Sequence, residues 1–169
     1  GNFTQAAGKL AINGAGTFVM DADTLNLNGG AITGVPVLVN STLAIGTSST
    51  ATGTVSFRGA SSLSGNVASG QTLLVQSTDN APATLTAAAD FTNSGTISLQ
   101  TLTYSGDSNL TVSAGTLTNA NTGVININPG SNGYHYLNAN ITNNGIVNFN
   151  ADGSLSKTNG LFTNNGQFN

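Results

Sequence analysis

The side chains best suited to ligand chemistry in this sequence are few and widely spaced. The single histidine, His135, lies between Tyr134 and Tyr136. On a strand the two tyrosines would share one face and the histidine would take the other. Two neighbouring aromatic rings could form a small platform on which a sugar ring stacks. The same pattern also fits a strand near a loop whose aromatic rings simply pack over the edge of a core.

All six acidic residues are aspartates, and Asp21 and Asp23 stand two positions apart. If both faced outward on one strand, they could bind Ca²⁺ or act as paired carboxylates. Calcium usually requires six or more oxygen ligands, and the sequence contains no Asp-rich calcium-binding repeat. We therefore expect solvated carboxylates at the end of a strand. The remaining aspartates lie beside turn residues, where such side chains cap their own backbone. They are Asp79, Asp90, Asp107 and Asp152.

The composition argues against several kinds of partner. Only 5% of the residues are charged, against roughly a quarter in ordinary globular domains. Three basic residues and a net charge of −3 cannot provide a phosphate-neutralising patch, so we expect no nucleic-acid partner. No apolar run approaches the ~18–20 residues of a membrane span, so we expect no membrane insertion. Cysteine is absent, which excludes disulfides and thiolate metal sites.

A short repeated phrase must position these side chains. It consists of an apolar residue, Thr-Asn, a turn that closes on Gly, and then alternating apolar and polar residues. Copies begin at Phe91, Ile141 and Phe162, and a looser copy with two extra residues begins at Leu117. Asn and Gly suit left-handed turns, and stacked Asn side chains can form hydrogen-bonded ladders. The expected turn and ladder residues are Asn93, Gly95, Asn119, Gly123, Asn143, Gly145, Asn164 and Gly166.

The spacing of the phrase predicts the fold. Its glycines are 28, 22 and 21 residues apart, and the expected strands are short. A period in the low twenties with few helix-forming polar residues predicts an all-β parallel β-solenoid. Residues 1–169 would form one domain, or a segment of a longer solenoid, with about seven to eight turns spaced ~4.8 Å apart. The alternative is an antiparallel β-sandwich, whose strands also recur at short intervals.

Alternating apolar residues locate the individual elements. We expect strands at 9–13, 17–21, 24–28, 37–39, 43–45, 54–57 and 72–75, and a weaker, exposed strand at 62–64. Loops are expected at 77–83, where Pro82 cannot donate to a central ladder, and at 129–133.

Several phrases resemble the β-helical repeat regions of very large bacterial surface proteins. They are Phe-Thr-Gln-x-x-Gly, Leu-Asn-Leu-Asn-Gly-Gly-Ala-Ile-Thr-Gly and Leu-Thr-Asn-x-x-x-Gly-x-Ile-x-Ile. The proteins include autotransporter passengers and filamentous-haemagglutinin-like adhesins, and the similarity covers nearly the whole chain. It implies a secreted, extracellular, right-handed parallel β-helix that serves as a stalk, an adhesin or a fibre. It does not extend to domains for anchoring or secretion, so attachment and export are not implied.

The expected function is therefore structural or adhesive, at the cell surface. Because the phrase occurs near both ends, at Phe3 and at Phe162, we expect the solenoid to continue into a longer chain or to stack head to tail with other copies. Glycans and host or cell surfaces are the other partners that such a role suggests. A carbohydrate-binding face that includes Tyr134 and Tyr136 is the first alternative.

Two further alternatives have less support in the sequence. A polysaccharide-cleaving β-helix enzyme needs clustered acids, or acids with a metal and a basic residue, and Lys9, Arg58 and Lys157 are far apart. We expect no catalytic residue, no metal and no cofactor. An ice-binding solenoid would need stacked threonines. The Thr-x-Thr pairs begin at Thr84, Thr101 and Thr116, at spacings of 17 and 15 that do not match the period.

Overall fold

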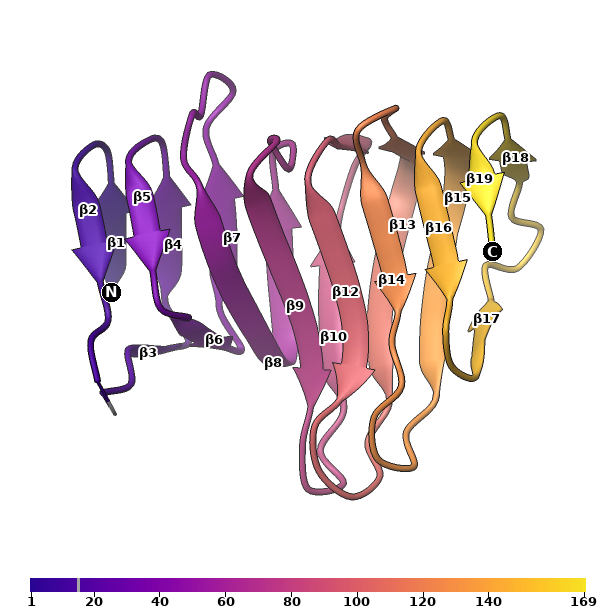
Figure 1. Cartoon of the computed structure of the whole chain (residues 1–169), viewed down its shortest axis with the longest axis horizontal. Coiled ribbons are helices and arrows are strands. Elements are labelled where there is room, and N and C mark those ends of the chain that lie inside the picture. The colour runs from indigo at the N-terminus through magenta and orange to yellow at the C-terminus, as the bar shows by residue number, and fades with distance from the viewer. Residues whose placement is uncertain (15) are drawn as a thin grey trace.

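The structure, a computed structural model, describes residues 1–14 and 16–169 and confirms the predicted β-solenoid, with about eight turns. The coils follow one another along the long axis, from the N-terminal coil at one end to the C-terminal coil at the other (Figure 1). The named strands pair only in parallel, which excludes the antiparallel sandwich. Over the described ranges there is no helix, and hence no helical segment that could cross a membrane.

Two faces make up most of each coil. The first face contains β1 (Asn2–Gln5), β4 (Thr24–Leu27), β7 (Thr42–Ile45), the second half of β8 (Gly53–Ser64), β10 (Ala83–Ala87), β11 (Phe91–Asn93), β13 (Ser108–Asn119), β15 (His135–Asn143), β17 (Gly153–Leu155) and β18 (Phe162–Asn164). The second face contains β3 (Val19–Asp21), β6 (Val37–Val39), the first half of β8, β9 (Gln71–Ser77), β12 (Thr96–Thr101), β14 (Val124–Ile127), β16 (Ile146–Phe149) and β19 (Gln167–Phe168). A shorter pair, β2 (Lys9–Ala11) and β5 (Ala31–Thr33), lies near the N-terminal end.

The strand register reproduces the spacing of the repeated phrase. Thr96 of β12 pairs with Val124 of β14, 28 residues later. Val124 then pairs with Ile146, and Ile146 with Gln167, at separations of 22 and 21 residues. The distance between the glycines of the phrase is therefore the length of one coil.

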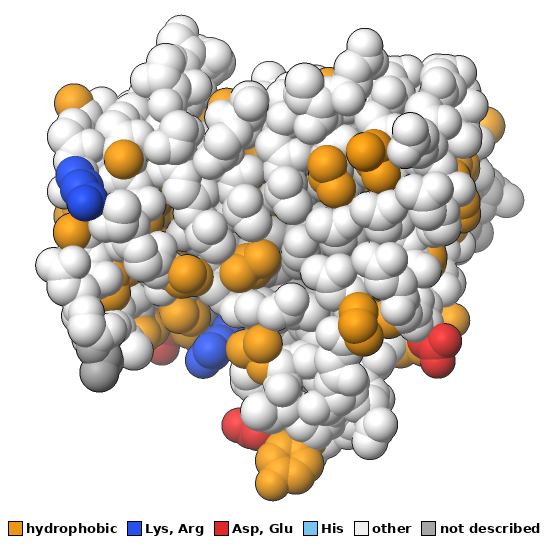
Figure 2. Space-filling view, in the orientation of Figure 1, with side chains coloured by type: hydrophobic (Ala, Val, Ile, Leu, Met, Phe, Trp, Pro, Cys, Tyr) orange, Lys and Arg blue, Asp and Glu red, His pale blue; other side chains and the backbone are white. Residues whose placement is uncertain are grey.

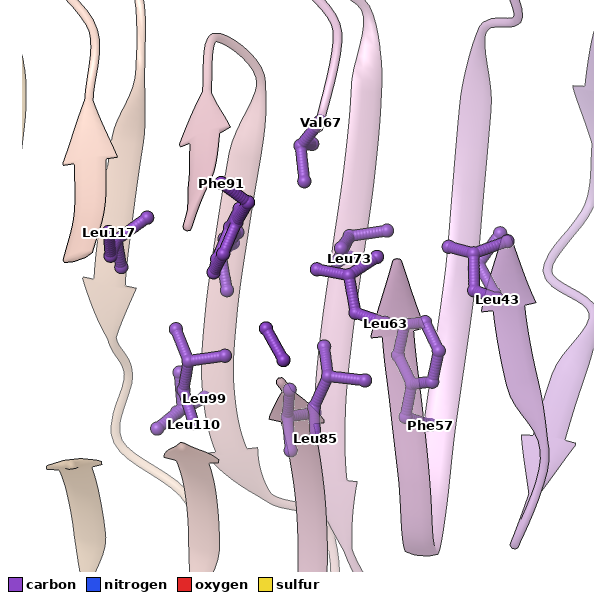
Figure 3. Packing of buried hydrophobic residues seen from close by; sticks show 14 of the residues in the cluster. Leu43, Phe57, Leu63, Val67, Leu73, Leu85, Phe91, Leu99, Leu110 and Leu117 are labelled. Atoms are coloured by element: carbon purple, nitrogen blue, oxygen red, sulfur yellow. The ribbon is translucent and has the colours of Figure 1, made fainter. Parts of the chain in front are cut away.

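Inward side chains from the two faces form one continuous core (Figure 3). On the first face Leu25, Leu43 and Leu63 occupy successive coils in register. On the second face Phe57, Val75 and Leu99 do the same. All six side chains are at most 4% exposed. Burying each one contributes ~1.5–3 kcal/mol, so the stack of coils is the main source of stability.

Some strands differ from the prediction. The segments at 54–57 and 62–64 belong to a single strand, β8, which turns the corner between the two faces at Gly59 with a φ of 61°. Leu63 is 4% exposed and belongs to the core, so the expected exposed strand at this position is wrong. A local pattern underestimates burial here because Leu63 is surrounded in sequence by serines and is covered by the coils on either side.

Three successive loops protrude from one edge of the stack, at the bottom of Figure 1. They connect β9 to β10, β12 to β13, and β14 to β15, and we call residues 78–82, 102–107 and 128–134 the loop lobe. The loops predicted at 77–83 and 129–133 belong to it. The middle loop was not predicted, because its sequence contains no proline to mark it.

Candidate functional site

A ladder of asparagine side chains connects four coils on the first face. The amide of Asn93 donates to Oδ1 of Asn119 at 2.9 Å, and Asn119 donates to Asn143 at 2.8 Å. Asn143 donates in turn to Asn164 of the last coil at 2.7 Å. The side chains of Asn93, Asn119 and Asn143 are completely buried. The four asparagines of the repeated phrase thus lie in one hydrogen-bonded column.

The same amides hold the corners of the coils. Nδ2 of Asn119 also donates to the backbone carbonyl oxygens of Gly123 and Ile146, at 3.2 and 3.1 Å. Oδ1 of Asn143 accepts the backbone N–H of Gly145 at 3.2 Å. Because an unpaired buried polar group costs ~1–3 kcal/mol, the ladder fixes both the position of each corner and the register between coils.

The ladder begins at Asn93. In the preceding coil the residue that bridges to Asn93 is Val67, which has no side-chain donor. Oδ1 of Asn93 therefore has no hydrogen-bond partner, and Nε2 of Gln71 in the same preceding coil also has none. In that preceding coil Oε1 of Gln71 accepts the backbone N–H of Ala68 at 2.8 Å, so a glutamine holds the corner in place of a ladder asparagine.

The glycines of the phrase do not have the conformation that we expected. None of the four has a positive φ. A Cβ atom on Gly145 would instead collide with the carbonyl oxygens of Ala120 and Gly123 in the preceding coil. Glycine is required here by the close approach of two coils and not by a left-handed turn. The residues in question are Gly95, Gly123, Gly145 and Gly166.

Further asparagine ladders lie on the outside of the last three coils. Asn148 donates to Asn126 at 2.8 Å, and Asn169 donates to Asn148 at 2.8 Å. Asn165 donates to Asn144 at 3.0 Å. These ladders were not predicted, although identical residues at the coil spacing indicate them.

The tyrosines and the histidine lie on opposite sides of β15, as the alternation predicts. Tyr134 and Tyr136 face outward, and their ring centroids are 5.0 Å apart with a 45° angle between the ring planes. His135 is 1% exposed, and its Nδ1 atom has no hydrogen-bond partner. The two rings lie next to each other on the outer side, and sugar stacking on them stays a prediction.

Burial gives His135 a testable effect on stability. Desolvation lowers the pKa of His135 below its usual value of 6.5, against the opposing effects of Asp107, the backbone of Asn128, and Asp152. The unfolded chain therefore binds more protons than the folded chain between the folded pKa and about 6.5.

We expect the unfolding free energy to be constant above about pH 7 and to fall by at most ~1.4 kcal/mol per pH unit as the pH drops below about 6.5. Urea unfolding from pH 7.5 to 5 measures this slope. Because His135 is the only histidine, His135→Gln should flatten the profile. A variant that keeps the wild-type slope would contradict this assignment.

The aspartates hold neighbouring loops and coils and do not form a joint site. Asp21 ends β3, and the φ of 56° at Ala22 interrupts the strand before Asp23, so the two carboxylates do not share a strand face. Oδ1 of Asp90 accepts the backbone N–H of Thr116 at 2.6 Å, and Oδ1 of Asp107 accepts that of Tyr134 at 3.0 Å.

Asp90 and Asp107 therefore cap the next coil, and the expectation that they cap their own turn is wrong. Asp79 behaves similarly, since it accepts the hydroxyl of Thr103 at 2.9 Å. Asp152 lies in the bend between β16 and β17.

The three Thr-x-Thr pairs do not stack on one another. Thr84 pairs with Asn109, Thr116 pairs with Asn140, and Thr101 is buried at the end of β12. A different set of threonines does stack in register on the outside of the first face: Thr92, Thr118, Thr142 and Thr163. In each copy of the apolar-Thr-Asn phrase, the threonine belongs to this outer column and the asparagine that follows it belongs to the buried ladder.

Other candidate groups remain apart. Nζ of Lys157 donates to the backbone carbonyl oxygens of Val112 and Ser113, at 2.6 and 3.1 Å. In the part of the chain that the structure describes, no three His, Cys, Asp or Glu side chains are placed to hold a metal ion. Comparison with known proteins gives no match to a protein family, a curated protein or a solved structure.

Proposed function

We propose that the chain is a structural length of an extracellular β-solenoid, serving as a stalk segment of a bacterial surface protein. The observation that carries this proposal is the buried asparagine ladder, which joins Asn93 to Asn164 without a break and reaches the last coil. Such a ladder stabilises the stacking of each coil on the next, which is what a repeated structural segment requires. The resemblance of the phrases to repeat regions of surface proteins supports the cell-exterior location.

The C-terminal coil has the features of a surface that pairs with another coil. Asn164 accepts a hydrogen bond from Asn143 of the preceding coil, and Asn165 and Asn169 donate to that coil. All three side chains are exposed. Leu161 and Phe168 expose 68% and 46% of their surface. A further coil that carries the same phrase would cover these apolar groups and extend each ladder by one step.

The strand register favours a stalk over a fibre of identical copies stacked head to tail. Phe3 belongs to the column that continues through Leu25, Leu43, Leu63 and Ala87. Phe162 belongs to the column of Ile141, Leu117 and Phe91, and Phe91 lies four residues after Ala87. The phrases near the two ends therefore occupy different columns and would not align across a junction between copies.

A duplicated coil tests the proposal. A second copy of residues 149–169 appended to the chain continues the register, because Asn169 already occupies the position of Asn148 one coil earlier. It should pair with β18 and β19, resist proteolysis and raise the unfolding midpoint. The matched control appends residues 148–169, which are one residue longer. The added residue shifts the register by one and turns the inward side chains outward, so this segment should not dock. Digestion of the unmodified extension, with no gain in stability, would argue against a propagating solenoid.

A further inference from the structure

Exposed apolar side chains concentrate in the loop lobe. Outside the two terminal coils, only four large apolar residues of the described chain are exposed, and three of them are Leu102, Tyr104 and Tyr134. The fourth is Val35. The three tyrosines of the chain, Tyr104, Tyr134 and Tyr136, all lie in this lobe or directly beside it. Figure 2 shows an apolar group at the tip of the protruding lobe, beside an acidic one. Further apolar groups are scattered over the rest of the visible face.

One residue of the lobe has a strained backbone. Asp79 and Asn80, with φ values of 47° and 63°, form a tight two-residue turn closed by hydrogen bonds between Thr78 and Ala81, where Asp and Asn are favoured. Tyr104 has a φ of 51°, which is a left-handed conformation outside such a turn. The side chain of Tyr104 is 71% exposed, so burial does not offset the cost of ~1–2 kcal/mol for this backbone. Strained residues of this kind concentrate at binding sites.

Register places polar groups beside the two outward tyrosines. On the outer side of the first face Tyr136 pairs with Asn109, and Asn109 pairs with Thr84. Nδ2 of Asn109 donates to Oγ1 of Thr84 at 3.4 Å. Successive coils are ~4.8 Å apart, so the amide of Asn109 lies next to the tyrosine pair and the hydroxyl of Thr84 lies one coil further away.

A groove adjoins this platform. It has a volume of about 320 Å³ and is lined by Asn80, Pro82, Ser105, Gly106 and Asp107. Ser105 donates its hydroxyl to Oδ1 of Asn80, which joins the first and second loops of the lobe. The carboxylate of Asp107 accepts the backbone N–H of Tyr134, so the groove and the platform meet at Asp107.

We propose that the groove and the tyrosine platform together bind a neutral oligosaccharide. The rings of Tyr134 and Tyr136 match the apolar face of a pyranose. The carboxylate of Asp107, the amides of Asn80 and Asn109 and the hydroxyl of Ser105 match its hydroxyl groups. No lysine or arginine is among the residues that line the groove, and the carboxylate of Asp107 is one of them, so the groove does not match an anionic saccharide. The proposal is independent of the stalk role, since a saccharide site could be carried by any rigid scaffold.

The intrinsic fluorescence of the chain reports on this site directly. The chain has no tryptophan, and its three tyrosines are all at or beside the lobe. Titration with five neutral hexasaccharides, namely cellohexaose, laminarihexaose, chitohexaose, maltohexaose and mannohexaose, should change the tyrosine emission with at least one of them. Calorimetry should give a dissociation constant of roughly 1 mM or tighter for that saccharide.

Variants assign the binding to the platform. Tyr136→Ala should weaken binding about tenfold or more, whereas Tyr136→Phe, which keeps the ring, should stay within about threefold of the wild type. Thr142→Ala, on the same face but outside the lobe, is the matched control and should leave binding unchanged.

Circular dichroism establishes that each variant is folded. Two results would overturn the proposal. One is wild-type affinity in Tyr136→Ala. The other is the absence of a response to all five saccharides.

Discussion

Asn119→Ala should lower the free energy of unfolding by about 2–4 kcal/mol. The substitution removes the acceptor of the Asn93 amide and the donor to Asn143, both of which lie in the buried ladder. It also removes the hydrogen bonds to the carbonyl oxygens of Gly123 and Ile146. Water cannot replace these partners, because the three ladder asparagines Asn93, Asn119 and Asn143 are completely buried.

Urea unfolding followed by circular dichroism measures this loss. The matched control is Asn126→Ala, which removes a similar amide from an outer ladder. Asn126 accepts from Asn148 at 2.8 Å but is only partly buried, so water can replace the bond and the cost should stay below about 1 kcal/mol. Equal losses in the two variants would show that the inner ladder has no special importance.

Gly145→Ala should be at least as damaging, with a loss of about 3 kcal/mol or more. The added methyl group would meet the carbonyl oxygens of Ala120 and Gly123. These atoms belong to the backbone of the preceding coil and cannot rotate away as a side chain could. The two coils must therefore separate at this corner, which also weakens the hydrogen bond from Gly145 N–H to Asn143.

A second glycine separates this collision from backbone strain. Gly8 has a φ of 73°, and a Cβ atom there would meet nothing within 4 Å. Gly8→Ala should therefore cost only the left-handed strain of ~1–2 kcal/mol. Thermal unfolding of both variants compares the two effects. A larger loss in Gly8→Ala than in Gly145→Ala would contradict the role assigned to close approach.

The repeated phrase predicted the coil because one residue pattern recurs once per turn. Thr96, Val124 and Ile146 follow equivalent glycines, so their spacing could be read without knowing the fold. The conformation of the glycines was not predictable in the same way. The contact that excludes a Cβ at Gly145 comes from the carbonyl oxygen of Ala120, which lies in the preceding coil. Local turn preferences contain no information about a contact between coils.

The loop lobe shows a second limit of sequence analysis. The sequence indicated the tyrosine pair, because alternation on a strand is local. It did not indicate that Asp107 would join that pair, since the bond from Tyr134 to Asp107 spans 27 residues. Nor did it indicate Asn80 and Ser105, which meet only because unequal loops of successive coils protrude at the same edge. Because these loops differ in length, the number of residues per coil also differs. A fixed repeat length therefore cannot predict which loop residues lie side by side.

Disulfide mapping tests the stacking of coils most directly. Thr118 and Thr142 pair in register on adjacent coils, and the chain has no cysteine of its own. Their expected Cα separation of ~4.8 Å lies within the range of a disulfide. Thr118→Cys with Thr142→Cys should form an intramolecular disulfide under mild oxidation and keep the β-sheet circular dichroism. Thr92→Cys with Thr142→Cys, two coils apart, should remain reduced. Failure of the adjacent pair to join, or efficient joining of the distant pair, would contradict the in-register solenoid.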